Sequence, residues 1–578
     1  MATRQSFPTR DVLRRPRLRL VDLLVGGAIF VALYGLLRLG LTVTRPFAPG
    51  HTQRSISTNP ASLPYYAMRS LTRMFIALGL SVAFTFVYGT AAARSRRAAK
   101  VLIPLLDILQ SVPILGFLTI TVTFFIALFP HSIVGLEMAS IFAIFTSQAW
   151  NMTFSFYHSL ISQPHDLDEA ARLMRLTKWE RFWRLDVPSS MIGLVWNGMM
   201  SFGGGWFFLT ASEAITINKR SYALPGIGSY VAAAALRSEL GHVLFAILVM
   251  IVMVLAVNFL FWRPMVAWSE RFRVEQSEAA EQPRSFMLDT LRRSRVPRIV
   301  ARPARTVAVF LDRITRPFGV ADRPLVANVA RRRAGDVAFG IVVAVVVAIG
   351  SVSAVRYVRD HVGLGEFAHA FGLGAITFAR VVVVVVVATL IWVPVGVKIG
   401  MTPSLTRYAQ PIVQILASFP ANFLFPFFAA FLVATGVGLN WGGIVLMALG
   451  AQWYILFNTI AGAISIPSDL REAMDNFGVH GWQRWRRLIL PGIFPAYVTG
   501  GITAAGGAWN ASIVAEFVTY GHHTLVATGL GSYIALSTID GQFAKVLTGI
   551  VVMSIYVVGL NHLLWRRLYR LAETRYSL

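Results

Sequence analysis

Residues 164–188 read PHDLDEAARLMRLTKWERFWRLDVP, and residues 467–491 read PSDLREAMDNFGVHGWQRWRRLILP. The two stretches align without gaps at a constant offset of 303 residues, and the alignment extends to residues 263 and 566. Identical residues of uncommon types occur throughout it: Pro164/Pro467, Asp166/Asp469, Glu169/Glu472, Trp179/Trp482, Arg184/Arg487, Pro188/Pro491, Trp206/Trp509, Glu213/Glu516, Gly228/Gly531, Tyr230/Tyr533 and Trp262/Trp565. A repeat of this length predicts one structural unit that occurs twice.

The composition is that of a membrane protein. Of the 578 residues, 56% are hydrophobic and 14% are charged, and the mean hydropathy is +0.61, whereas soluble proteins have about 25% charged residues. The net charge of +26 does not indicate nucleic-acid binding, because the arginines lie between apolar runs, as the positive-inside rule predicts. Without cysteine the chain has no disulfide or thiolate metal site. The first apolar run lacks a small-residue cleavage site, which predicts an uncleaved span.

Twelve apolar stretches are long enough to cross about 30 Å of hydrocarbon as helices. They fall near residues 22–42, 69–93, 101–129, 133–157, 191–212, 238–262, 336–358, 373–400, 411–434, 441–463, 492–514 and 541–564. Because lipid permits only helices or closed barrels, we predict an all-α polytopic protein made of two six-helix repeats.

The basic connections predict the orientation. Arginine and lysine are concentrated in six connections, namely the two tails and residues 94–100, 158–190, 263–335 and 464–490. The positive-inside rule therefore predicts that both termini and both repeated loops lie in the cytoplasm. An even number of spans per half predicts a parallel repeat, because an inverted repeat needs an odd number.

These patterns divide the chain into five parts. We expect a basic cytoplasmic tail over 1–21, a first membrane domain over 22–262 with its core at 70–262, a linker over 263–335, a second membrane domain over 336–565 with its core at 373–565, and a cytoplasmic tail over 566–578. The linker holds 16 Arg and 7 Asp or Glu. It is interpreted as a solvated segment held at anionic lipid headgroups, with a docking or regulatory element as the alternative.

Each repeated loop begins like a capped helix. An aspartate, Asp166 or Asp469, follows a proline and precedes a glutamate by three residues, which resembles a capping box. A short amphipathic helix is then expected, with aromatic residues on one side and arginines around them; the aromatic sets are Trp179 and Phe182, and Trp482 and Trp485. A basic, aromatic-faced helix that occurs twice in the cytoplasm predicts a docking site, and an interfacial helix lying on the bilayer is the alternative.

The loops resemble the Glu-Ala-Ala loop of ABC importer permeases, whose pattern is E-A-A-x3-G-x9-I-x-L-P. The matching residues are Glu169, Ala170, Ala171 and Pro188 in the first copy, and Glu472, Ala473, Gly478 and Pro491 in the second. The first copy has Arg175 at the glycine position, and the second has Met474 in place of an alanine. We expect Arg175 to give a different bend after the first helix, and thus two unequal contacts with the partner.

Further motifs resemble the nitrate, sulfonate, taurine and bicarbonate branch of these permeases. They are Ala508-Trp509, Ala515-Glu516-Phe517, Thr528-Gly529-Leu530-Gly531, Pro225-Gly226-Ile227-Gly228, Ile108-Leu-Gln110-Ser-Val-Pro113 and Ile415-Leu-Ala-Ser418-Phe-Pro420. The resemblance covers roughly residues 70–265 and 373–567, and it implies the type I permease fold in a bacterial inner membrane.

The resemblance also implies the partners. Each repeated loop would form a coupling helix, including Asp166 and Trp179 or Asp469 and Trp482, seated on one of two ATP-binding subunits at the cytoplasmic face. A periplasmic or lipid-tethered solute-binding protein would deliver a small solute, expected to be an anion. This chain has no G-x-x-x-x-G-K-[S/T] phosphate loop, so we expect it to be no enzyme and to carry no cofactor, with ATP and Mg²⁺ bound by the partner subunits.

Polar residues at membrane depth are candidates for the pathway or a gate. Glu213 and Glu516 are interpreted either as a gate or binding-protein contact, or as structural carboxylates that pair with a base such as Lys219 or Arg220. Trp206 and Trp509, two helical turns earlier, would line the pathway or pack a glycine-rich interface. Gln110, Asn151 and Asn197 are further candidates, although hydrogen bonding between helices also explains such residues. No metal site is predicted, since His522 and His523 lack a third ligand at a recognisable spacing.

Two other function classes compete with an ABC permease. An ion-coupled secondary transporter with a duplicated bundle would need several ionisable groups deep in the spans. A membrane enzyme or scaffold has no catalytic constellation to support it. The sequence does not identify the substrate.

Overall fold

The computed structural model describes residues 56–272 and 329–575, except His131 and Asn218, together with seven isolated residues: Gly27, Tyr34, Leu288, Asp289, Phe310, Arg313 and Ile314. The predicted first span near 22–42 and most of the predicted linker 263–335 lie outside the described residues.

The predicted apolar ranges within the described residues are helical. In the first half the long helices are α2 (Leu63–Arg94), α3 (Arg96–Ser111), α4 (Ile114–Leu128), α5 (Val134–Ile161), α8 (Val187–Glu213) and α10 (Leu240–Val257). In the second half they are α14 (Val329–His361), α15 (Leu364–Gly400), α16 (Pro403–Ser418), α17 (Phe425–Thr435), α18 (Leu439–Ser465), α21 (Leu490–Ala515) and α23 (Phe543–Leu560). The all-α polytopic fold is thus confirmed.

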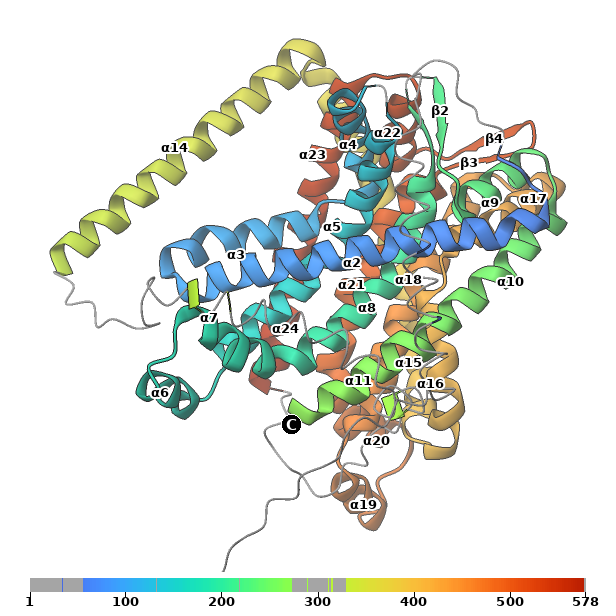
Figure 1. Ribbon diagram of the computed structural model, residues 1–578. Coiled ribbons are helices and arrows are strands. Elements are labelled where there is room, and N and C mark those ends of the chain that lie inside the picture. Colours follow the sequence, from blue (N-terminus) through green and yellow to red (C-terminus); the bar gives the residue numbers. More distant parts are fainter. Residues whose placement is uncertain are drawn as a thin grey trace, which may run out of the picture.

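Eleven of the twelve predicted spans lie within the described residues, and each is helical. Seven of the described helices are long and apolar enough to cross a membrane, or nine if each of two bent pairs counts as one span. Helices α5 and α8 also fill predicted ranges, but they are outside this count. Both carry many Ser, Thr and Asn residues along their length. Helix α14 stands apart from the bundle (Figure 1).

The third predicted span of each half is broken, which the sequence analysis did not anticipate. Helices α3 and α4 meet at 102° around Pro113, and α16 and α17 meet at 82° around Pro420. Proline has no N–H to donate and forces the residue before it into an extended conformation. Val112 (ψ 125°) and Phe419 (ψ 129°) adopt that conformation.

Shorter elements complete the two ends of the bundle. The first repeated loop forms α6 (His165–Leu173), α7 (Lys178–Arg181) and the π-helical η2 (Phe182–Asp186), and the second forms α19 (Ser468–Asn476), α20 (Gly481–Arg484) and η7 (Trp485–Ile489). At the other end lie two hairpins, β1 (Ala214–Ile217) with β2 (Arg220–Ala223) and β3 (Phe517–Tyr520) with β4 (His523–Val526), each followed by a short helix, α9 (Ile227–Leu236) or α22 (Leu530–Ile539). The second half ends in η8 (Asn561–Trp565) and α24 (Arg566–Arg575).

Both repeated loops project from the same end of the bundle, whereas the hairpins lie at the opposite end (Figure 1). This arrangement is that of a parallel repeat. In both hairpins the pairing is antiparallel, with Ala214 opposite Ala223 and Phe517 opposite Val526.

The two halves exchange structure across their interface. Apolar residues of α4, including Leu118, belong to the core of the second half, and Phe423, next to α17, belongs to the core of the first. The side-chain oxygen of Asn510 on α21 accepts the N–H of Ile114, 2.8 Å away, at the start of α4. Thr210 on α8 bonds the side chain of Asn422 (2.7 Å) at the other break. Each broken span is therefore held by the fifth predicted span of the other half.

The hairpins repeat this exchange. The N–H of Lys219, in the turn between β1 and β2, donates to the carbonyl of Ile539 at the end of α22 (2.7 Å). The N–H of Gly521, in the turn between β3 and β4, donates to the carbonyl of Ala235 at the end of α9 (3.0 Å). Each hairpin thus caps a helix of the opposite half, since the last carbonyls of a helix have no partner within it.

Candidate functional site

The repeated loops begin differently from the prediction. The residues before the first helical turns are Pro164 and Pro467, and neither helix has a side-chain cap. Asp166 and Asp469 instead lie inside the first turn, where a carboxylate interacts favourably with the positive end of the helix. The predicted capping at these aspartates is therefore wrong.

A complete capping box lies farther along the first loop, at the start of α7. Thr177 accepts the N–H of Glu180 (3.1 Å), and Glu180 accepts the N–H of Thr177 (3.0 Å). The second loop has His480 at this position and no side-chain cap. Trp179 and Phe182 lie on this segment, which continues into α8, and not on a free amphipathic helix. Trp179 packs on Phe182 and Trp183, whereas Trp482 of the second loop is exposed.

The turn after the first short helix is the same in both loops. Arg175 (φ +50°) and Gly478 (φ +64°) both adopt the left-handed conformation. The N–H of Leu176 bonds the carbonyl of Ala171, and the N–H of Val479 bonds that of Met474. These are the bonds of a Schellman motif. The expectation of a different bend at Arg175 is wrong, because the backbone bonds impose the turn even on a residue with a Cβ atom.

In each loop a contact between an arginine and a carboxylate joins the two short helices. The acidic residue of this contact stands at a different position in each loop. In the first loop Asp168 bonds both Arg172, at 2.6 Å, and Arg181 on α7. In the second loop the positions of Asp168 and Arg172 hold Arg471 and Asp475. Asp475 accepts from Arg484, the equivalent of Arg181, at 2.6 Å.

These contacts shift the acidity of the first loop. Partial burial raises the pKa of Asp168, but the hydrogen bonds and positive charges of Arg172 and Arg181 outweigh burial and hold this pKa below its ordinary value. The carboxylate of Asp168 is therefore ionised in the folded loop at neutral pH.

The outer surfaces of the two loops share one chemical pattern. Glu169 and Glu472 are exposed, and so are the apolar side chains of Met174 (73%) and Phe477 (82%), which occupy equivalent positions. Ala171 is buried, and Ala170 and Ala473 are half-buried. Pro188 and Pro491 occupy the first turn of α8 and α21, where the missing N–H is tolerated. The alanines thus face inward, and each loop presents an exposed carboxylate and an exposed apolar side chain.

Glu213 is buried in a charged cluster at the opposite end of the bundle. Its carboxylate accepts from Arg73 (2.7 Å) and Ser70 (2.6 Å) on α2 and from the N–H of Gly228 (2.7 Å) at the start of α9. Arg73 also bonds Glu137 through two nitrogens, at 2.6 and 2.8 Å, and Arg69 bonds Glu137 at 2.6 Å. Two arginines thus balance two glutamates.

The second half has a smaller version of the cluster. Glu516 accepts from Arg380 (2.8 Å), Thr377 (2.9 Å) and the N–H of Gly531 (2.8 Å). Asn440 takes the place of Glu137 and accepts from Arg380 at 2.8 Å, and Ile376 takes the place of Arg69. The second cluster therefore has one positive and one negative charge fewer than the first, and both clusters are neutral.

The contacts within the two clusters distinguish between the structural and the gate interpretations of Glu213 and Glu516. Both carboxylates are completely buried and fully engaged, which favours the structural interpretation over the gate. Their bases are Arg73 and Arg380, and not the nearby Lys219 or Arg220. A Cβ atom at Gly226 or Gly529 would lie 2.2 or 2.3 Å from the carboxylate, so these positions of the two glycine motifs need glycine.

The other candidates lie apart from one another. Trp206 and Trp509 are buried in the cores of their halves, against Phe202 (ring centroids 5.5 Å apart) and Tyr556 (6.0 Å) respectively, and pack the interior. Gln110 and Asn151 are exposed. Asn197, a further polar residue at membrane depth, donates to Ser155 on α5 (3.1 Å) and thus joins two helices.

A small cavity that no sequence pattern indicated lies between the halves. It is about 50 Å³ in volume and is lined by glycines of α8 and α21, by Tyr454 and Asn510, and by the aromatic side chains Phe207, Phe208, Phe419 and Trp453. No Asp, Glu, Lys or Arg is among its lining residues in the described part of the chain. The polar residues next to the two proline breaks were the available signal, but only the fold brings them together.

Comparisons with known proteins agree with the duplicated architecture. Residues 60–271 and 392–577 each match the profile of the family described as binding-protein-dependent transport system inner membrane component. Similar proteins include a putative ABC transporter permease protein of Methanocaldococcus jannaschii, 26% identical over 201 residues. The nitrate import permease protein NrtB of Leptolyngbya laminosa is 26% identical over 190 residues, and the glycine betaine/proline betaine transport system permease protein ProW of Salmonella typhimurium is 25% identical over 199 residues. These alignments cover 35%, 33% and 34% of this chain, and 70%, 64% and 53% of the respective relatives.

Proposed function

Because this chain belongs to the family of binding-protein-dependent transport system inner membrane components, we propose that it is the translocating subunit of an ATP-driven importer in a bacterial inner membrane. Two ATP-binding subunits would engage the loops that contain α6 and α19, on the cytoplasmic side. A periplasmic or lipid-tethered solute-binding protein would engage the hairpin end. The termini would then lie in the cytoplasm, as the basic connections predict.

The observation that carries this proposal is the pair of matching loop surfaces. Each loop exposes one glutamate, Glu169 or Glu472, together with large apolar side chains, and an arginine–carboxylate contact joins its two short helices. The most exposed apolar side chains are Leu173 and Met174 in the first loop and Phe477 and Trp482 in the second. Exposed apolar side chains that form a patch with a polar rim mark a protein interaction site. Because the loops lead directly into α8 and α21, a force on either loop would be transmitted to the fifth helix of that half. Closure of the two ATP-binding subunits would thereby rock the halves against each other.

The test is co-purification of the full chain with its ATP-binding subunits. We expect two copies of the ATP-binding subunit per chain, and Glu169→Lys or Glu472→Lys should lower both their retention and the stimulated hydrolysis of ATP. Asp540→Lys is the matched control for retention of the ATP-binding subunits, since Asp540 is exposed at the opposite, hairpin end. If both loop variants retained the ATP-binding subunits and transported as well as the wild type, the proposal would be wrong. Transport driven by an ion gradient without any ATP-binding subunit would favour the secondary transporter instead.

For the substrate we propose a small anion such as nitrate, a sulfonate such as taurine, or bicarbonate. The resemblance of the glycine motifs and the similarity to a nitrate import permease support this class. A quaternary ammonium solute is the second candidate. The aromatic side chains around the interface cavity favour it, because a cation is attracted to aromatic faces.

Uptake into vesicles that contain the full chain, its ATP-binding subunits and its binding protein would separate the two classes. At least one of labelled nitrate, taurine and bicarbonate should be accumulated, and glycine betaine should neither be accumulated nor compete. Accumulation of glycine betaine alone would reverse the assignment. The variants Tyr454→Phe and Trp453→Leu then test the role of the cavity. A cationic solute should lose more affinity in Trp453→Leu than in Tyr454→Phe, because only Trp453→Leu removes an aromatic face.

A further inference from the structure

Within the part of the chain that the structure describes, the second half contains a large cavity that has no counterpart at the equivalent place in the first half. It is about 430 Å³ in volume and is lined by Thr389 and Val393 of α15, Arg486 of η7, Leu571 of α24, and Leu490, Pro491, Ile493, Phe494 and Tyr497 of α21. It therefore lies where the second repeated loop turns into α21, beside the C-terminal helix. This volume falls within the range of ligand-binding pockets.

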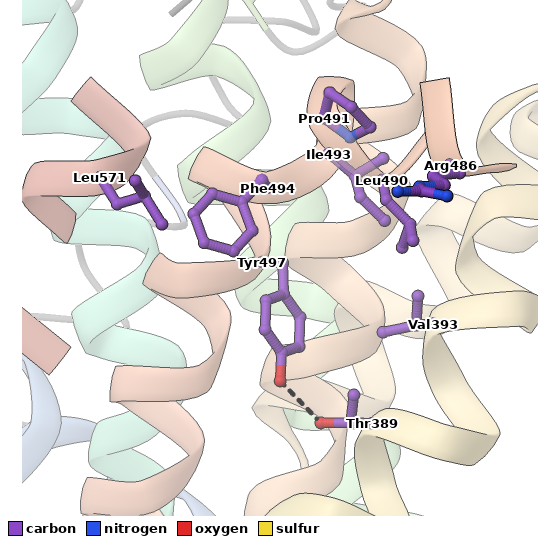
Figure 2. A pocket seen from close by; sticks show the side chains of 9 residues that line it. All are labelled: Thr389, Val393, Arg486, Leu490, Pro491, Ile493, Phe494, Tyr497 and Leu571. Carbon is purple, nitrogen blue, oxygen red and sulfur yellow. Dashed lines mark hydrogen bonds between the residues drawn. The ribbon is translucent and has the colours of Figure 1, made fainter. Parts of the chain in front are cut away.

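The lining is apolar except at its two ends. Figure 2 shows Arg486 beside Leu490 at one end and the hydrogen-bonded pair of Thr389 and Tyr497 at the other. The two hydroxyl oxygens lie 3.0 Å apart, and Thr389 also donates to the carbonyl of Val385 (2.7 Å), so these groups satisfy each other. Arg486 is exposed and forms no ion pair with any carboxylate among the described residues. The cavity thus offers an apolar interior and one available positive charge.

The equivalent space in the first half is filled with aromatic rings. The alignment that pairs Ser70 with Thr377 and Gly89 with Gly396 also pairs Phe86 with Val393, and Trp183 stands where the second half has Arg486. Phe86 packs against Phe182 (5.3 Å between ring centroids) and Trp183 (6.2 Å). Two replacements, Phe86 by Val393 and Trp183 by Arg486, therefore distinguish an open cavity with a cation from a closed aromatic cluster.

We propose that this cavity binds one anionic phospholipid of the cytoplasmic leaflet, with an acyl chain in the apolar interior and the headgroup phosphate paired with Arg486. The charge and the apolar lining together match this ligand, because a basic pocket at the cytoplasmic ends of membrane helices attracts anionic headgroups. A water-soluble anion would leave the interior empty, and an uncharged apolar molecule would leave Arg486 without a partner. The side of the membrane rests on the proposed function, in which the repeated loops are cytoplasmic.

A bound lipid would affect one coupling loop only. Arg486 lies between α20 and α21, so a headgroup held there ties the second loop to the bilayer surface, whereas the first loop is tied down by its own aromatic rings. The second coupling loop would then depend on lipid composition and the first would not.

The experiment uses the purified full chain in detergent. Dioleoyl phosphatidylglycerol and dioleoyl phosphatidylcholine are titrated separately, and bound lipid is counted by native mass spectrometry. We expect one high-affinity site that prefers phosphatidylglycerol by about fivefold, the usual contribution of one arginine near an anionic lipid surface. Val393→Phe should fill the cavity and lose both lipids, and Arg486→Gln should keep binding but lose the preference.

The controls are chosen from the same elements. Val387→Phe adds the same ring to α15 at an exposed position, and Arg487→Gln removes an exposed arginine that does not line the cavity. Both should bind lipid like the wild type. Unchanged binding in Val393→Phe, an unchanged preference in Arg486→Gln, or displacement of the lipid by inorganic phosphate would each overturn the proposal. Because this assay needs no ATP-binding subunit, lipid binding without their retention would refute the proposed function and leave the lipid site standing.

Discussion

The buried charged cluster of the first half can be tested by substitution, because the second half shows which pair of residues can replace Arg69 and Glu137. Replacing Glu137 with Asn, the residue found at the equivalent Asn440, removes a carboxylate that accepts three hydrogen bonds from Arg69 and Arg73, at 2.6, 2.6 and 2.8 Å. The cluster then carries a net positive charge in a buried site. Arg69→Ile alone leaves the opposite imbalance.

The magnitudes follow from this count of charges. Breaking a buried ion pair by removing one partner costs about 3–5 kcal/mol, because the remaining charge is left uncompensated. The double replacement Arg69→Ile/Glu137→Asn restores neutrality and reproduces the arrangement in which Arg380 bonds both Glu516 and Asn440 at 2.8 Å. We therefore expect each single variant to be clearly destabilised and the double variant to recover most of the loss, with a coupling energy of about 2 kcal/mol or more.

The assay is thermal unfolding of the full chain in one detergent, followed by tryptophan fluorescence and by the loss of the monodisperse peak in size-exclusion chromatography. Each single variant should unfold about 5 °C or more below the wild type, and the double variant should lie closer to the wild type than either single variant. If the double variant lost as much as the two single variants together, the two residues would not act as a pair and the reasoning would be refuted.

Three further predictions concern the loops and the glycine motifs. Arg175→Gly should stabilise the first loop by about 1 kcal/mol, since glycine adopts the left-handed conformation without strain, and slower hydrogen exchange of residues 165–176 would show it; faster exchange would contradict the Schellman assignment. Gly226→Ala should strongly reduce the yield of folded protein, because its Cβ would meet the Glu213 carboxylate, whereas Gly241→Ala has open space and should behave like the wild type; equal yields would contradict this. The pKa of Asp168 is lowered in the folded loop. Its contacts should therefore stabilise α6 fully at pH values above 3.8, the ordinary pKa of this carboxyl group. This stabilisation should be lost as the pH falls from 3.8 through the lower pKa of the folded loop. Proteolysis of the loop measured against pH, with Asp168→Asn as the control, checks the sign, and a loss on raising the pH would refute it.

Long-range contacts explain what the sequence could not predict. The apolar runs and the repeat were sufficient for the helices and for the two matching loops, because these depend on local composition. Pro104 and Pro113 show the limit of such reasoning, since the first lies inside α3 and the second ends it. At Pro113 the chain can turn sharply because Asn510, far away in the sequence, accepts the N–H of Ile114. A partner of this kind leaves no local signal.

The candidate site was predicted unevenly for the same reason. Exposure of Glu169 and Glu472 follows from their place on polar helices, whereas the partners of Glu213 and Glu516 depend on packing between distant helices. Arg73 and Arg380 could have been noticed as charged residues within spans, which are usually paired. Arg175 was misjudged because a residue preference was considered without the backbone bonds that determine the turn.

The exchange between the halves has a consequence for biosynthesis. While the ribosome is still making the second half, the first half already lies in the membrane with the N–H of Ile114 lacking the partner that Asn510 later supplies. A backbone group that stays unbonded in hydrocarbon costs several kcal/mol. We therefore expect the first half to stay in the insertion machinery, or this N–H to bind water, until translation reaches residue 510. A fused gene places the two halves in that machinery in a fixed order and in equal number, which two separate chains would have to achieve by diffusion.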